Sequence, residues 1–165
     1  MSESARLKLP FLSPGQAQKE AFHNEALQIL DLVAAAAVEE LPRNDPPASP
    51  TLGACYLVGP SPTGDWVGKS HCLTAYTTGG WRYVAPVEGM SVFVKTTDTF
   101  ATYRASIWEF GALRGDKLLI GGQQVVAGRL PAIPEPGGGT IADVEGRAAI
   151  GQILAALRQH GLIES

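Results

Sequence analysis

The sequence is poor in charge, and its charged residues form no cluster of one sign. They make up 18% of the 165 residues, with a formal net charge of −3, whereas soluble domains usually carry about 25%. Without a basic cluster there is no electrostatic case for binding nucleic acid or an anionic membrane. No apolar run is long enough to cross a bilayer, and residues 1–12 lack the apolar core of a signal peptide. We therefore expect a protein made in the cytoplasm, with no nucleic-acid partner and no membrane insertion.

Cysteine is scarce, and the residue patterns of the common catalytic and metal sites are missing. Cys55 and Cys72 are the only cysteines. In a chain without an export signal we expect two buried free thiols rather than a disulfide. Their spacing matches no zinc motif, and His23, His71 and His160 form no short metal-binding pair. The sequence therefore predicts no catalytic, cofactor-binding or metal-binding residue, and an uncharacterised enzyme ranks third among the functions considered.

Glycine and proline, in contrast, are plentiful, with 19 and 12 residues. Two proline-rich stretches are predicted to be stiff, extended linkers that divide the chain. The sequence predicts a mainly β protein with a long N-terminal helix and a C-terminal helix, α+β overall. The predicted order is an extended arm at 1–12, a helix at 13–41, a linker at 42–50, a β domain at 51–130, a linker at 131–139 and a helix at 140–163.

The rest of the chain is organised around the long N-terminal helix. Ser13 and Gln16 form a capping box, and Pro42 is expected to end the helix at Leu41. Two adjacent rows of apolar residues make a face that the chain cannot easily cover alone. We expect this face and the stripe of the C-terminal helix to form a homo-oligomer, with a trimer favoured and His23 in a polar layer near the axis. The predicted interface consists of Phe22, His23, Ala26, Leu27, Ile29, Leu30, Val33, Ala34, Ala37, Leu41, Ile150, Ile153, Leu154 and Leu157.

The middle of the chain changes its apolar period from that of a helix to that of a strand. In residues 52–58 both alternating sets are apolar, which predicts a strand buried on both faces. Gly79-Gly80 and Gly121-Gly122 predict two-residue hairpin turns, because glycine accepts positive φ at both positions. Short strands at this spacing favour a small antiparallel sandwich or barrel.

Aromatic residues gather in the same β segment and suggest a ligand. Trp66, Trp81 and Tyr83 lie near Asp65 and Arg82, and flat rings beside polar groups suit the apolar faces and hydroxyl edges of sugars. The alternative for each ring is a place in the hydrophobic core. These three residues are the candidates for contact with a host-surface glycan, and a stand-alone carbohydrate-binding module is the second function considered.

Four blocks of the sequence resemble a domain-of-unknown-function family found in prophage tail and fibre proteins and in gene-transfer-agent head-spike proteins. The blocks are LPFLSPGQAQKEAFHNEALQILD (9–31), PASPTLGACYLVGPSPTGDWVGK (47–69), TTGGWRYVAPVEGMSVFV (77–94) and LLIGGQQVV (118–126). The tail GGTIADVEGRAAIGQILAALRQHGLI (138–163) resembles the terminal helix of such proteins. The resemblance implies a non-enzymatic spike, fibre or adaptor on the exterior of a phage-like particle, attached to other particle proteins. It implies an assembly role for Gly15, Gln16, Gln18, Lys19, His23, Asn24, Glu25, Leu27 and Leu30.

Overall fold

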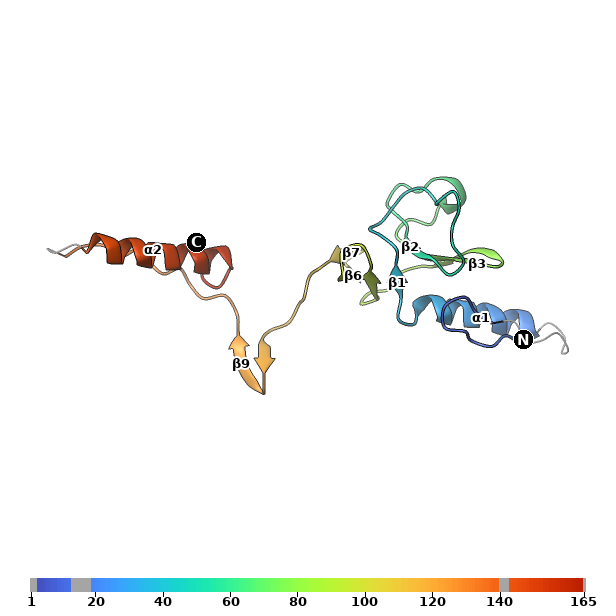
Figure 1. Cartoon of the computed structure of the whole chain (residues 1–165), viewed down its shortest axis with the longest axis horizontal. Helices are drawn as coiled ribbons and strands as arrows, with labels where there is room; N and C mark the ends of the chain where they lie inside the picture. The colour runs from blue at the N-terminus through green and yellow to red at the C-terminus, as the bar shows by residue number, and fades with distance from the viewer. Residues whose placement is uncertain (1–2, 13–18, 140–142, 165) are drawn as a thin grey trace. The chain divides into compact units, whose positions relative to one another are not determined.

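The computed structural model describes residues 3–12, 19–139 and 143–164. The chain divides into two compact units, Met1–Ala112 and Leu113–Ser165, which we call the N-terminal and the C-terminal unit (Figure 1). The division falls inside the predicted β domain at 51–130. The segment after the hairpin at Gly121-Gly122 pairs with the end of the chain and so belongs to the C-terminal unit. The backbone N–H of Leu130 donates to the carbonyl of Leu162 at 3.0 Å.

The N-terminal helix α1 spans Lys19–Val33 and is shorter than predicted. The predicted end at Leu41 is wrong, because Ala35 takes a left-handed conformation with φ of 47° and turns the chain away. The next residues enter the short strand β1, Ala37–Val38, and Val38 is fully buried. Burial has therefore overridden the helical propensity of the alanine run. The predicted capping box at Ser13 and Gln16 lies outside the described residues.

The N-terminal segment is not an extended arm but a loop that returns on itself. Glu3 and Pro10 form an antiparallel bridge, and the backbone N–H of Ser4 donates to the carbonyl of Leu9 at 2.9 Å. From this loop the guanidinium of Arg6 donates to the carbonyl of Leu32 in the last turn of α1 at 3.2 Å, and to that of Ala35, just after the helix, at 2.8 Å. The last carbonyls of a helix have no partner within it, so Arg6 supplies the cap that the sequence of α1 lacks.

Two β-sheets make up most of the N-terminal unit. One has the order β2-β3-β4 and is antiparallel, and the other has the order β1-β5-β6-β7 with β1 and β5 parallel. The segment after β1 joins the two sheets, since the N–H of Glu39 donates to the carbonyl of Cys55 at 2.9 Å. The predicted α+β class is confirmed, whereas a sandwich or barrel stays a prediction. The strands are β2 (Cys55–Leu57), β3 (Leu73–Thr77), β4 (Gly80–Val84), β5 (Ser91–Val94), β6 (Thr99–Arg104) and β7 (Ile107–Phe110), with a short 3-10 helix, η1 (Gly64–Trp66), between β2 and β3.

The prediction of a strand buried on both faces is confirmed by β2. Cys55 and Leu57 belong to a core cluster that includes Leu32 of α1, whereas Tyr56 belongs to a second cluster around Trp66. The sheet β2-β3-β4 therefore lies between two hydrophobic layers. One layer contacts α1 and the other sheet, and the second is rich in aromatic rings.

The two cysteines lie in different layers, one on each face of this sheet. Both are free and buried, with Cys55 in the cluster beside Leu32 and Cys72 in the cluster around Trp66. Alternate side chains of a strand point to opposite faces, so the fold holds the two thiols apart. Burial raises the pKa of the Cys55 thiol from its ordinary 9.0 to about 11.

This pKa shift predicts that stability falls in alkali. The unfolded thiol loses its proton near pH 9, before the folded one does, so Cys55 contributes stability below pH 9 that is lost as pH approaches 11. A shift of this size corresponds to about 3 kcal/mol. The Cys55→Ala variant, which has no thiol at this position, should therefore lose less stability than the parent between pH 8 and pH 11 in urea unfolding. If the unfolding free energies of the two proteins fell equally over this pH range, the raised pKa of the Cys55 thiol would be contradicted.

The C-terminal unit holds one hairpin and one helix. The hairpin joins β8 (Leu118–Ile120) to β9 (Gln123–Val126), and both turn glycines have positive φ, as predicted for Gly121-Gly122. In the earlier hairpin the strands pair through Thr77 and Gly80, so that turn lies one residue before the predicted Gly79-Gly80. Helix α2 spans Val144–Gln159, starting later than the predicted residue 140. The Asp143 side chain caps it by accepting from the N–H of Gly146 at 2.8 Å.

Candidate functional site

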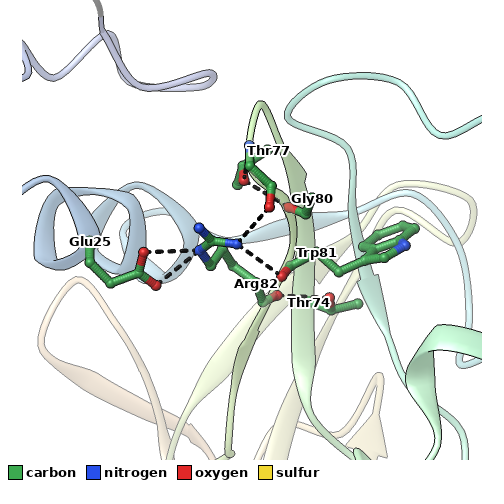
Figure 2. A network of polar contacts seen from close by, with 7 residues as sticks. Glu25, Thr74, Thr77, Gly80, Trp81 and Arg82 are labelled. Atoms are coloured by element: carbon green, nitrogen blue, oxygen red, sulfur yellow. Dashed lines mark hydrogen bonds and ion pairs between the residues drawn. The ribbon is translucent and has the colours of Figure 1, made fainter. Parts of the chain in front are cut away.

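Helix α1 turns several of its polar side chains, including Glu25 and Asp31, toward its own domain. Figure 2 shows Arg82 reaching from β4 to Glu25 of α1, while Trp81 points to the other side of the strand. The Arg82 Nε atom lies 2.9 Å from Glu25 Oε1, and the guanidinium also donates to the carbonyl of Gly79 at 3.1 Å. Thr74 fixes the strand by donating its hydroxyl to the carbonyl of Arg82 at 2.8 Å. The contact between α1 and β4 is thus partly an ion pair.

Because the Glu25–Arg82 pair is partly exposed, we expect it to contribute modestly. Its two side chains retain 45% and 27% of their exposure, and exposed pairs are worth about 0.2–1 kcal/mol. The Glu25→Gln variant should therefore lose less than about 1 kcal/mol of unfolding free energy in low salt. The loss should shrink in about 1 M salt, where screening weakens such pairs. A loss of several kcal/mol, unchanged by salt, would contradict this view.

Asp31 anchors the N-terminal loop to α1. This carboxylate is 5% exposed, and it accepts hydrogen bonds from the Ser4 hydroxyl at 2.8 Å, from the backbone N–H of Arg6 at 2.9 Å and from that of Leu7. The sequence analysis did not identify Arg6 or Asp31. For Asp31 a signal was present: it is a single acidic residue in an otherwise apolar stretch of helix, and such a residue is expensive to bury without partners.

The outward face of α1 is apolar and exposed. Phe22 is 79% exposed, Leu30 is 52% exposed, and Ile29 and Ala26 are exposed between them. His23 is exposed on the same side. In a typical surface helix the apolar stripe faces the core. In α1 only Leu32, Val33 and in part Leu27 do so, and this second apolar face is left exposed.

The predicted α1 interface is partly corrected by the structure. Ala34, Ala37 and Leu41 do not lie on the helix, because α1 ends at Val33. Val33 packs against the core, and Leu27 is half-buried. Gln28 of α1 faces inward. It lines a small cavity between α1 and the N-terminal loop, and its Oε1 atom is buried.

The predicted interface residues of the C-terminal helix fall into two groups. Ile150 and Ile153 are exposed on α2, whereas Leu154 is buried and Leu157 is half-buried. Leu154 therefore packs within its own unit, and only the first two residues present a surface to a partner.

The predicted glycan-contact residues belong to one aromatic cluster. Trp66 is fully buried, and its ring lies 5.1 Å from Trp81 and 5.9 Å from Tyr56 in edge or tilted contacts. Trp66 is thus a core residue and cannot stack on a sugar in this structure. Trp81 and Tyr83 are half-buried at the edge of the cluster, and the Lys69 amine lies 5.3 Å from the centre of the Tyr83 ring.

A groove of about 540 Å³ lies beside β2 and β1 and is lined by several charged residues. Two of its charged side chains pair with each other, since Lys95 Nζ lies 2.7 Å from Glu39 Oε1. Within the described residues, no group of three or more histidine, cysteine, aspartate or glutamate side chains could hold a metal ion. No helix of the described segments is long and apolar enough to span a membrane.

Comparisons with known proteins place the N-terminal unit in a protein family. Comparison with curated proteins and with solved structures gives no match. A family model matches residues 23–109, from within α1 to β7, which is more than half of the chain. The description of the family states no activity. The chain therefore belongs to the family described as "Protein of unknown function (DUF2793)".

Proposed function

We propose that this protein is a non-enzymatic structural component of a phage-like or gene-transfer-agent particle, serving as a spike, a fibre or an adaptor, and that it self-associates through α1. The observation that carries the proposal is that this helix leaves an apolar face exposed while it packs on its own domain. Its polar residues bind the N-terminal loop and β4, as Asp31 and Glu25 do, while Phe22 and Leu30 face outward.

Burial of this exposed face between copies would favour association. Burying a Leu, Ile or Phe side chain that would otherwise face water contributes about 1.5–3 kcal/mol. Phe22, Ile29 and Leu30 all lie on this face. Symmetric packing of identical helices buries the same residues on every copy. A trimer places three such faces around one axis with His23 close to it, which is the arrangement we favour.

The placement on a particle is supported by the sequence blocks at 9–31, 47–69, 77–94 and 118–126, which resemble prophage tail, fibre and head-spike proteins. On this proposal the chain is made in the cytoplasm, assembles with other particle proteins and ends on the particle exterior. A structural role requires no catalytic constellation, only surfaces for self-association and attachment.

Purified particles test the particle assignment. Particles from the producing strain should contain this protein in a fixed number of copies per capsid by quantitative mass spectrometry. External protease should cleave it in intact particles while the capsid protein survives. Its absence from particles, with the same protein abundant in the cytoplasm, would contradict the proposal.

A carbohydrate-binding module is the second candidate, favoured by the partly exposed Trp81 and Tyr83 rings beside Lys69. If a glycan stacks there, the Trp81→Ala variant should bind host cells at least tenfold more weakly, since a stacked aromatic in a binding site is worth about 2 kcal/mol or more. The Phe100→Ala variant, which removes an exposed ring from another strand, should bind like the parent. With both variants folded by circular dichroism, equal binding would exclude this site.

A further inference from the structure

The C-terminal unit buries too little to be stable by itself. Of its described residues, only Leu154 and Ile163 are buried, although the unit spans Leu113–Ser165. Every residue of β8 and β9 is exposed. An isolated two-stranded hairpin is marginally stable at best in water. A single helix that contains two glycines, as α2 contains Gly146 and Gly151, is also marginal alone.

Apolar side chains cover more than one side of this unit. Successive residues of a strand point to opposite faces, and Leu118, Leu119 and Ile120 are consecutive in β8 and all exposed. Both faces of the hairpin are therefore apolar. On α2, Ile150 and Ile153 are exposed as well. A partner that docked on one side alone would leave the other side in water.

A groove completes this surface. It has a volume of about 350 Å³ and lies between the end of β9 and the segment that follows α2. Its lining is almost entirely aliphatic, from Val125, Val126, Leu130, Ile133, Leu157 and Leu162. A groove of this kind suits an aliphatic side chain from a neighbour rather than a charged or polar ligand.

We propose that the C-terminal units of several copies of this chain wind around one another, with β8 of one copy pairing with β9 of the next. The sheet β8-β9 has two strands, so both outer edges are unpaired within the unit. Pairing of unlike edges is heterologous, and it leaves no free edge when the copies close into a ring.

The charge of the unit favours copies of itself as the occupant. Residues 113–165 contain five basic and five acidic side chains, so the unit has no net charge that would select an oppositely charged partner. Winding around identical units also covers both hairpin faces and α2 together. This inference rests on the self-association proposed above, but it uses residues that are separate from α1.

Hydrogen exchange of the full-length protein tests the pairing. In an isolated hairpin, alternate amides point out of the ladder and exchange with solvent. In the ring, those amides are paired too. Peptides covering residues 118–126 should therefore show protection of nearly all amides, and the protection should fall on dilution below the dissociation constant of the assembly. Protection of only the alternate amides at every concentration would overturn the proposal.

A matched pair of variants on α2 separates this inference from the role of α1. Ile153→Asp places a carboxylate on the apolar surface, whereas Gln152→Asp places it on an exposed polar position of the same helix. We expect exchange in residues 118–126 to become about tenfold faster in Ile153→Asp and to stay unchanged in Gln152→Asp. Equal exchange in the two variants would overturn the ring.

The Leu30→Asp variant of α1 distinguishes the two proposals. If C-terminal protection survives in this variant, the ring forms independently of α1 and the inference stands. If wild-type protein associates while its hairpin exchanges rapidly at all concentrations, the α1 proposal stands and the ring is wrong.

Discussion

Replacing Asp31 by alanine is expected to lower the unfolding free energy of the N-terminal unit by about 3 kcal/mol. The carboxylate is 5% exposed and accepts hydrogen bonds from Ser4, Arg6 and Leu7. Hydrogen bonds to a charged group contribute about 1.5–3 kcal/mol, and the donors left behind are partly buried without a partner. The loop should detach from the end of α1, and Arg6 should lose its position as the helix cap.

Urea unfolding followed by tryptophan fluorescence measures this effect in the relevant unit, because all three tryptophans, Trp66, Trp81 and Trp108, lie in it. Asp31→Asn keeps one acceptor oxygen and should lose less than Asp31→Ala. Asp65→Ala removes an exposed carboxylate of the same unit and should cost less than about 0.5 kcal/mol. If Asp31→Ala and Asp65→Ala unfold at the same urea concentration, Asp31 is not the anchor described here.

The second large effect is expected on association. Leu30→Asp places a carboxylate at the centre of the exposed face of α1, where the wild-type side chain is 52% exposed in the single chain. If this face is buried between copies, the unpaired charge costs several kcal/mol. The association constant should then fall by about a hundredfold or more, while the fold of the single chain is unchanged.

Leu41→Asp is the matched control, since Leu41 is 47% exposed and lies outside the helix. It introduces the same charge on a leucine of similar exposure, and we expect it to associate like the parent in sedimentation equilibrium. Gln28→Asp is unsuitable as a control, because Gln28 faces the interior of the unit. Equal weakening by Leu30→Asp and Leu41→Asp would show that charge, and not the α1 face, controls association.

The features that could be predicted from the sequence are those with a local cause. The doubly apolar pattern of residues 52–58 identified β2 as buried on both faces. Gly121-Gly122 located a hairpin because few other residues accept positive φ at two successive positions. The region of α2 was identified from its apolar stripe. Its C-terminal end follows the rule that glycine takes a left-handed conformation just after a helix, and Gly161 has φ of 69°.

The features that could not be predicted depend on contacts between distant residues. Four consecutive alanines carry no stop signal, yet Ala35 turns the chain because Ala36 and Val38 are buried beyond it. The cap comes from Arg6, which precedes α1 in the sequence, whereas the rules for helix ends consider only residues at and just after the C-terminal end.

The aromatic residues and the orientation of α1 show the same limit. Apolar periodicity identified a face on α1, but periodicity does not say whether that face meets its own domain or a neighbour. Here hydrogen bonds and an ion pair hold the polar side against the domain. Composition likewise could not separate the buried Trp66 from the half-buried Trp81, because both stand beside a glycine and a charged residue.

Light scattering of the full-length protein during size-exclusion chromatography tests self-association most directly. At tens of micromolar, the account predicts the mass of two or more chains of 17.4 kDa each, with three chains as the favoured number. The Leu30→Asp variant should shift toward lower mass under the same conditions, and Leu41→Asp should not. A wild-type mass of 17.4 kDa at these concentrations would contradict the central claim.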